Sequence, residues 1–418
     1  MTFRRYSIAE IFRQGLGGHQ GWAPAWRMPE LKKRYDVIVI GGGGHGLATA
    51  YYLAKNHGTT NVAVLEKGWI GGGNSGRNTT IIRSNYFFPA SARIYDLALR
   101  LYEGLSDDLN FNIMLSQRGL LTLAHSDHAL ELAARSVNAM LINGIDVELL
   151  SASQVQAEVP LLNFAPDARF PIHGGYIQRR GGIARHDAVV WGYARAADAL
   201  GVDIIQGCEV TGFRIEGGRV VGLDTTRGSV EAGAVGMAVA GHSGQLAAKA
   251  GFELPILSYA LQAMVSEPIK PMLDTVVMSP TTGAYVSQSD KGEMVIGAGL
   301  DLYPSYAQRG NLVGTRTILA GLTELFPSFR RLKMMRQWAG IVDVCWDYSP
   351  IIGPSPVDGL YLNCGWGTGG FKAIPGGGYV LAHILATGRH HEFSAPFDLR
   401  RFETGALIDE AAGAGIAH

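Results

Sequence analysis

The chain has 418 residues, of which 47% are hydrophobic and 17% are charged, as is typical of a globular protein with a large core and about two domains. The 36 basic and 36 acidic side chains cancel, so the net charge gives no indication of binding to nucleic acid or to a membrane surface. No apolar run reaches the roughly 18 residues of a membrane-spanning helix, and we expect no signal peptide, because no apolar stretch follows Arg4 and Arg5.

Residues 1–34 precede the first predicted strand and form an N-terminal tail. Ser7 and Glu10 have the spacing of a capping box and predict a short amphipathic helix. Trp22 and Trp26 follow in a segment that contains glycine and proline. Because this tail is too short to form its own core, we expect it to pack either on this protein or on a partner subunit.

A glycine-rich turn follows the first predicted strand. Residues 37–40 are apolar and β-branched, which predicts a buried parallel strand, and residues 47–55 predict a helix. Between them, Gly41, Gly43 and Gly46 match the dinucleotide pattern G-x-G-x-x-G in its proper context. Gly44 and His45 complete the turn, which would present the start of the helix to a pyrophosphate. The alternative is a glycine-rich turn with only a structural role.

Residues 61–65 predict a second buried strand that ends in Glu66. A carboxylate at this position accepts hydrogen bonds from a ribose 2′-hydroxyl and repels a 2′-phosphate. The sequence up to this point therefore predicts a dinucleotide without a 2′-phosphate, and it leaves NAD and FAD open.

Further strands of the same type follow much later in the chain, near residues 203, 237 and 361. Predicted helices at 91–118, 127–143, 187–200 and 313–326 and a strand-rich stretch at 258–300 come between or around them. One parallel sheet interrupted by insertions favours a flavoprotein over a nicotinamide enzyme.

We therefore expect an α/β fold with a Rossmann-like, discontinuous FAD-binding domain and a second α+β substrate domain on a mostly antiparallel sheet. The expected boundaries are 1–34 for the tail, 35–118, 177–255 and 340–400 for the FAD domain, 119–176 and 256–339 for the substrate domain, and 401–418 for a C-terminal tail.

Several separated motifs together resemble one family. They are the glycine turn at 41–46, Glu66, residues 77–83 (RNTTIIR), residues 240–243 (AGHS) and residues 364–372 (CGWGTGGFK). This pattern resembles the FAD-dependent amine-oxidising family that includes glycine, sarcosine and dimethylglycine oxidases, and within it the β-subunit type of heterotetrameric sarcosine oxidases. The likeness runs from the N-terminal tail to residues 401–410.

The resemblance implies an αβγδ complex in which this chain holds noncovalent FAD at the amine site. It also implies FMN attached covalently to a histidine of this chain near the α subunit, with NAD and tetrahydrofolate on a partner subunit. The activity implied is oxidative demethylation of sarcosine to glycine and formaldehyde or methylene-tetrahydrofolate, with electrons passing from FAD to FMN and then to O₂, which gives H₂O₂.

Two cations are candidates for binding the substrate carboxylate. Arg83 and Lys372 match the family's arginine after T-x-I-I and its lysine after G-G-F. Two cations suit an amino-acid carboxylate, especially when one is an arginine that can donate two parallel hydrogen bonds to it. The alternatives are a surface arginine and a lysine at a helix start. The FAD contacts that the resemblance implies also include the N–H groups of Gly367 and Gly370 near the flavin, with Val210 under the adenine. The remaining implied contacts are Asn74, Arg77, Asn78, Thr79 and Ile81.

Two histidines are candidates for the FMN attachment. The family motif is a basic residue followed by His and Asp, shortly after an Arg-x-Gly stretch, and His186 matches it better than His173. The alternative for His186 is a position that only neighbours a helix cap.

The three cysteines, Cys208, Cys345 and Cys364, have no metal-site spacing and favour a reducing compartment, so we expect a cytoplasmic protein. Cys345 lies roughly where monomeric relatives tether FAD, but a buried inert thiol is the favoured interpretation. No lysine that could activate oxygen stands out around residues 293–299, which fits oxygen reduction at FMN.

Three other functions stay open at this point. One is a dehydrogenase subunit for proline, dimethylglycine or another secondary amine. The second is a non-catalytic scaffold subunit that contains FAD, and the third, disfavoured by the split sheet, is an NAD-dependent dehydrogenase.

Overall fold

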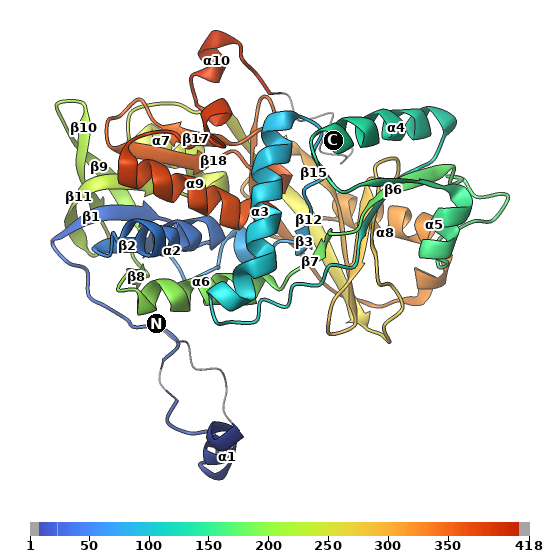
Figure 1. The fold of residues 1–418 in the computed structure, drawn as a ribbon, viewed down its shortest axis with the longest axis horizontal. Helices are drawn as coiled ribbons and strands as arrows, with labels where there is room; N and C mark the ends of the chain where they lie inside the picture. Colours follow the sequence, from blue (N-terminus) through green and yellow to red (C-terminus); the bar gives the residue numbers. More distant parts are fainter. Residues whose placement is uncertain (1–7, 23, 409–418) are drawn as a thin grey trace.

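The structure is a computed structural model that describes residues 8–22 and 24–408. Two sheets of eight strands each form its body, with the first sheet on the left in Figure 1 and the second on the right. A two-stranded ribbon, β3 (Ile81–Ile82) with β7 (Gly182–Ile183), is separate from both sheets. None of the helices in the described part of the chain is long and apolar enough to cross a membrane.

The first sheet brings together strands that are far apart in the sequence. Its main path runs β17-β18-β11-β1-β2-β8, and β10 and β9 extend from β11 as an antiparallel pair. Neighbours from β18 to β8 are parallel, with Ile38 of β1 opposite Ala63 and Val235. This sheet confirms the prediction that strands near 37, 62, 203, 237 and 361 are neighbours. Its strands are β1 (Arg34–Ile40), β2 (Val62–Glu66), β8 (Asp203–Gln206), β9 (Val210–Glu216), β10 (Arg219–Thr225), β11 (Gly228–Met237), β17 (Ile351–Pro354) and β18 (Leu360–Cys364).

Helices cover the first sheet and bury its apolar side chains. On one face, α2 packs against α9 and α6, and its buried leucines, alanines and tyrosines join the valines of β1 and β2 in one core. The other face is covered by β9, β10 and a short helix that enclose a second core around Ile38 and Val235. The helices of this half are α2 (Gly44–His57), α3 (Pro89–Asp108), α6 (His186–Ala199), α7 (Ser243–Lys249) and α9 (Ile374–Thr387).

The second sheet has the order β16-β12-β15-β14-β13-β4-β6-β5. All neighbours in it are antiparallel except β13 and β4, which confirms the expected mostly antiparallel sheet. Two of the expected domain boundaries, 176/177 and 339/340, fall inside β6 and β16, and the domain division otherwise stays a prediction. The elements here are β4 (Leu120–Ala124), α4 (Asp127–Ile142), β5 (Glu148–Ser151), α5 (Ala152–Glu158), β6 (Gly174–Gln178), β12 (Ile256–Pro268), β13 (Val276–Ser279), β14 (Ala284–Gln288), β15 (Glu293–Pro304), α8 (Leu312–Leu325) and β16 (Met334–Cys345).

The helix predicted at 91–118 is too long. Helix α3 ends at Asp108 because Asn110 has a φ angle of 45°, outside the right-handed helical region, and Met114 further on has a φ of 54°. The Asn112 side chain then accepts a hydrogen bond from the backbone N–H of Met114, at 2.9 Å. Asparagines compete for backbone hydrogen bonds in this way and often end helices.

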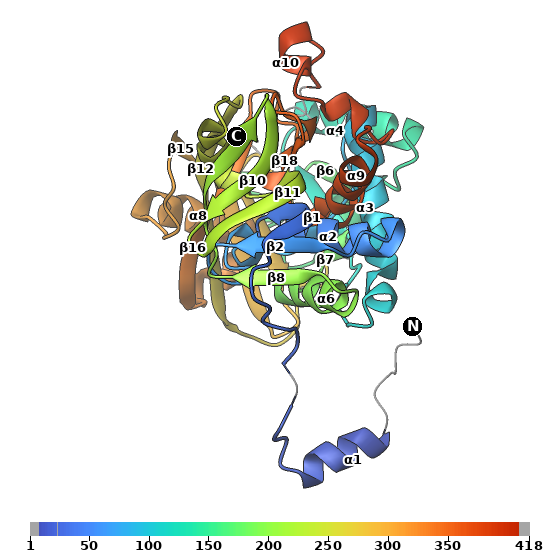
Figure 2. The ribbon, with the colours of Figure 1, turned by 90° about the vertical axis from the view of Figure 1, so that its left-hand side faces the viewer.

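The N-terminal tail has one part that packs on the body and one that does not. Trp26 packs against the core under α2, and Arg27 pairs with Asp198 at 2.9 Å. The predicted helix is present as α1 (Ile8–Leu16), and it stands away from the body in both views (Figures 1 and 2). Its apolar side chains, Ile8, Ile11, Phe12 and Leu16, are all exposed.

The C-terminal tail begins inside the protein. Arg401, the first residue of α10 (Arg401–Thr404), is 4% exposed and pairs with both carboxylate oxygens of the buried Asp347, at 2.7 and 2.9 Å. The predicted tail is therefore fixed to the end of β16 at its first residue.

Candidate active site

A cavity of about 580 Å³ lies between the two sheets. Its walls come from the carboxyl ends of β1 and β2, the loop after β2, strands β12 and β16, and the turn after β18. Most residues that the sequence predicts for FAD or substrate binding line this one cavity. They are Gly41, Gly43, Gly44, His45, Glu66, Asn74, Arg77, Asn78, Thr79, Ile81, Arg83, Val210, Gly367, Gly370 and Lys372.

The turn at residues 41–46 is shaped by close backbone contacts. Gly41 has a φ of 110°, and a Cβ atom there would lie 2.3 Å from the carbonyl oxygen of Ala238. Gly46 does not line the cavity, but a Cβ atom on it would lie 1.9 Å from the Gly41 carbonyl oxygen. Gly46 thus lets α2 approach β1, as the sequence pattern predicts. Sequence reasoning missed Ser75, whose hydroxyl accepts the Gly44 N–H at 2.9 Å.

Glu66 ends β2 at the wall of the cavity. Its two carboxylate oxygens accept the backbone N–H groups of Gly42 and Gly68, each at 2.8 Å. These two donors fix the orientation of the carboxylate, which suits it to accept hydrogen bonds from a ribose. Val210 lines the same cavity, beside Cys208 and Glu209.

The loop after β2 connects the first sheet to the second. Asn74 makes two hydrogen bonds with the backbone of Ile341 in β16, and the Trp338 indole donates to the Arg77 carbonyl at 2.7 Å. The Arg77 guanidinium donates to the carbonyl oxygens of Gly72 and Gly73. The polar groups of Asn74 and Arg77 therefore hold the loop in shape at the cavity wall.

Arg83 and Lys372 are two buried cations in the wall of the same cavity. Arg83 is 3% exposed, donates to the Asn85 side-chain oxygen at 2.9 Å and lies over the Tyr86 ring, at 4.4 Å from its centroid. Lys372 is 6% exposed and donates to the Thr368 carbonyl at 3.1 Å. Burial, and then the positive charge of Arg83, hold the pKa of Lys372 well below its ordinary value. An anion between the two cations would relieve this repulsion.

His45 connects the first glycine turn to the last one. Its Nε2 atom lies 2.8 Å from the Gly370 carbonyl oxygen, and its ring packs on Trp366 with centroids 5.0 Å apart. Burial lowers the pKa of His45 to about 4, so the imidazole is neutral at ordinary pH. His45 thus has the geometry of a loop contact, which is how the sequence pattern is best interpreted.

The two candidate histidines differ in their surroundings. His186 begins α6 outside the cavity, and its Nδ1 atom is buried with no hydrogen-bond partner in the described structure. Burial lowers the pKa of His186, while among the neighbouring charges Asp187 raises it and Arg185 and Lys291 lower it. His173 instead has its Nδ1 atom 2.8 Å from a carboxylate oxygen of Asp127. An unpartnered imidazole nitrogen is what a covalent attachment requires, so His186 fits this role better.

Cys345 and Asp343 lie close together at the end of β16. Burial holds the pKa of the Cys345 thiol well above its ordinary value, and this cysteine does not line the cavity, so its geometry fits the inert thiol. Sequence reasoning missed Asp343, which lines the cavity and accepts the Gly365 N–H at 2.5 Å. Burial raises the pKa of Asp343 to about 7. The signal in the sequence was an acidic residue within the apolar run at 341–344.

Comparison with known proteins decides the family. The sequence profile of the FAD dependent oxidoreductase family matches residues 36–384. A sarcosine oxidase subunit beta from Rhodobacter capsulatus is 56% identical over 415 residues, which cover 99% of this chain and all of that relative. The chain belongs to the sarcosine oxidase β-subunit family. It is therefore an FAD-dependent oxidoreductase. The glycine turn and Glu66 predicted a dinucleotide without deciding between NAD and FAD, and the family decides for FAD.

Two other similarities agree with this family. A sarcosine oxidase subunit beta from Rhizobium meliloti is 55% identical, with 97% of each chain covered. Among solved structures, L-proline dehydrogenase from P. horikoshii is 27% identical, with a TM-score of 0.85, and the match covers 90% of this chain and all of that one. The fold of this flavoenzyme family therefore extends over both sheets.

Proposed function

We propose that this chain is the amine-oxidising subunit of a sarcosine oxidase. The substrate would be sarcosine, whose N-methyl carbon would lose two electrons to the flavin and form an imine. Water would hydrolyse this imine to glycine and formaldehyde, or the carbon would pass to tetrahydrofolate supplied by a partner subunit to give methylene-tetrahydrofolate. The observation that carries this proposal is the pair of buried cations, Arg83 and Lys372, in the cavity that the glycine turn and Glu66 also line. Bound FAD would supply the two-electron oxidation, and a second flavin, FMN, would pass the electrons to O₂ to give H₂O₂.

The two cations have different parts in binding. The Arg83 guanidinium presents a planar fork to the substrate carboxylate, while the Lys372 ammonium adds a point charge. Because burial and Arg83 lower the pKa of Lys372, a bound carboxylate would raise that pKa again. Binding of the substrate is therefore expected to take up a proton at Nζ of Lys372. The N–H groups around Gly367 and Gly370 would stabilise negative charge at the pyrimidine end of the flavin.

The decisive experiment is an anaerobic titration of the purified, FAD-loaded protein with sarcosine. Loss of the oxidised-flavin absorbance supports the proposal, and a flavin that stays oxidised would indicate the scaffold subunit instead. A second candidate function is oxidation of proline or another secondary amine, because the L-proline dehydrogenase of P. horikoshii shares the fold over 90% of this chain. Parallel titrations with proline and dimethylglycine, and the peroxide yield with each amine, distinguish these substrates.

We also propose that FMN is attached covalently to His186. Support comes from the buried Nδ1 atom, which has no hydrogen-bond partner in the described structure, and from the positive charge of Lys291 near this imidazole. Arg185, the other nearby cation, is already paired with Asp187 and Asp290. Intact-mass measurement of the denatured chain, followed by peptide mapping, tests this assignment. We expect the flavin mass on the peptide that contains His186, its loss in His186→Ala, and its retention in His173→Ala. Flavin on the His173 peptide would overturn the assignment.

The relatives are named as subunits, and we propose that this chain likewise assembles with α, γ and δ subunits, which would carry NAD and tetrahydrofolate. The exposed apolar face of α1, with Phe12 and Leu16, supports the proposal that the N-terminal tail contacts a partner. Deletion of residues 1–16 should weaken assembly with co-expressed partner subunits, as measured by size-exclusion chromatography, without loss of FAD.

A further inference from the structure

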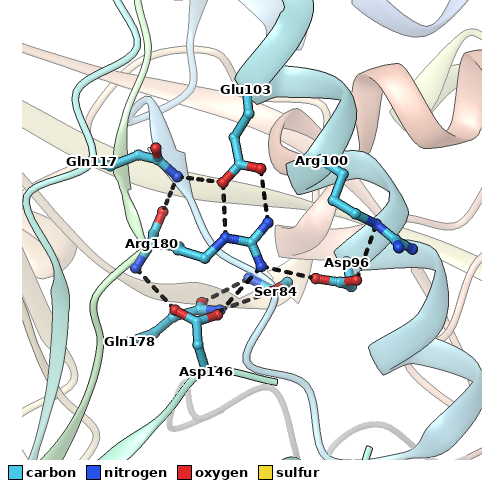
Figure 3. Close-up of polar contacts among 8 residues, drawn as sticks. All are labelled: Ser84, Asp96, Arg100, Glu103, Gln117, Asp146, Gln178 and Arg180. Carbon is cyan, nitrogen blue, oxygen red and sulfur yellow. Dashed lines mark hydrogen bonds and ion pairs between the residues drawn. The ribbon is translucent and has the colours of Figure 1, made fainter. Parts of the chain in front are cut away.

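A network of polar side chains contacts Ser84, the residue that follows Arg83 in the chain (Figure 3). Its inner member is Gln178 at the end of β6, which is fully buried. The Gln178 side-chain oxygen accepts the backbone N–H of Ser84 at 2.9 Å, and its amide nitrogen donates to the Ser84 hydroxyl at 2.8 Å. Ser84 follows Arg83 in the chain, so this two-bond contact fixes the backbone that carries the guanidinium.

The network continues outward and ends on helix α3. The Gln178 amide nitrogen also donates to Asp146 at 3.0 Å, and the Arg180 backbone N–H donates to the other oxygen of that carboxylate at 3.1 Å. The Arg180 guanidinium forms two hydrogen bonds of 2.8 Å to Glu103 of α3. It makes a third contact of 3.4 Å to Asp96, which lies two turns before Glu103 on the same helix. Both N–H hydrogens of the Gln178 side-chain amide therefore donate hydrogen bonds, and one lone pair of its oxygen accepts one.

The same helix holds the second cation. Tyr102 of α3, 1% exposed, donates its hydroxyl to the Phe371 carbonyl at 2.7 Å, and Phe371 precedes Lys372. Helix α3 thus supports the residues next to both cations. It contacts Phe371 directly, and it reaches Ser84 through Arg180, Asp146 and Gln178. When Lys372 carries its proton it repels Arg83, so a rigid support helps to keep the two groups at a fixed spacing.

We infer that Gln178 is a positioning residue for carboxylate recognition: it holds Ser84, and through it Arg83, at the spacing from Lys372 that a small carboxylate requires. This inference rests on the proposed function, because it takes Arg83 and Lys372 as the carboxylate site. Gln178 itself does not line the cavity, so its effect on a ligand would be indirect.

The test compares Gln178→Met with Gln117→Met in the FAD-loaded protein. Gln117 is an exposed member of the same network that donates to Glu103 and to the Arg180 carbonyl, each at 2.9 Å, without contact to Ser84. The Kd of acetate is measured from the change in flavin absorbance, and KM and kcat are measured with sarcosine. We expect Gln178→Met to raise the acetate Kd and the sarcosine KM about tenfold, with a smaller effect on kcat and an unchanged FAD content. Gln117→Met should leave all four close to wild type.

The outcomes separate this inference from the proposed function. An unchanged acetate Kd in Gln178→Met, or an equal rise in Gln117→Met, overturns the role of Gln178 while the proposed function stands. A wild-type protein that neither binds acetate nor has its flavin reduced by sarcosine overturns both. If Gln178→Met does not fold, Ser84→Ala removes one of the two bonds and leaves the contact of Gln178 with Asp146, so we expect a rise in the acetate Kd of about threefold. An unchanged value in that variant overturns the inference.

Discussion

The substitution Lys372→Met tests the charge arrangement of the site most directly. Removing one partner of a buried ion pair costs about 3–5 kcal/mol, and the lower end applies here because Arg83 remains to face the carboxylate. A loss of about 3 kcal/mol corresponds to a rise of roughly 10²-fold in Kd. We expect this rise for acetate, measured from the flavin absorbance, with FAD still bound. Lys249→Met is the matched control, because Lys249 is an exposed lysine that lines the same cavity.

Although Lys372→Met should weaken acetate binding, it should stabilise the ligand-free protein against unfolding. The ligand-free protein keeps Lys372 buried beside Arg83, and burial of a poorly solvated polar group costs about 1–3 kcal/mol. Lys372→Met should therefore raise the free energy of unfolding of the ligand-free protein, as measured by urea denaturation. A stability equal to or below that of wild type, together with an unchanged acetate Kd, would refute the reasoning.

The dependence on pH has a definite sign. The folded protein lowers the pKa of Lys372, so between that lowered value and the ordinary lysine value the unfolded chain binds more protons. Wild-type stability should rise with pH across this window, and the advantage of Lys372→Met should shrink there. Acetate binding to wild type should weaken as the pH rises above the lowered pKa, whereas in Lys372→Met this part of the pH dependence should be absent.

Three further substitutions test other parts of the structure. Gly46→Ala places a Cβ atom 1.9 Å from a backbone oxygen and should lower the free energy of unfolding by about 1–3 kcal/mol or more. Gly73→Ala is the control, because a Cβ atom there meets no atom within 4 Å and should leave stability unchanged. Thermal unfolding and FAD content are measured for both variants. Glu66→Gln loses one charge-assisted N–H contact and should weaken FAD binding about tenfold in a reconstitution titration, and unchanged binding would argue against the ribose contact. Arg401→Met leaves the buried Asp347 without its cation and should lower the free energy of unfolding by about 3–5 kcal/mol in a urea titration; a value near zero would contradict the importance of this pair.

The features that could be predicted from the sequence are those set by local pattern. The strand, turn and helix around residues 37–55 form from adjacent residues, and the glycine spacing follows from close contacts within the turn. Arg83 and Lys372 could be named before their common cavity was known because the short motifs before them resemble those of a known family. Asn110 shows the limit of periodicity, because one residue in the left-handed region ends a helix whose apolar pattern continues.

The support behind the site could not be predicted in the same way. Gln178, Asp146 and Glu103 come from a strand, a loop and a helix, and their contacts depend on how the second sheet meets α3. Polar residues at such positions read as ordinary surface residues in the sequence, since nothing local indicates that Gln178 is fully buried. Asp343 is different, because an acidic residue within an apolar strand does stand out in the sequence.

The order of strands in the first sheet has a consequence for how the protein is made. Strand β1 and the first glycine turn leave the ribosome early, but β18 and the turn at residues 367–372 are synthesised near the end of the chain. The nascent protein can therefore form one wall of the flavin cavity long before the opposite wall exists. We expect capture of FAD to wait until synthesis is almost complete, so that prematurely terminated chains accumulate without flavin and are left to chaperones and proteases.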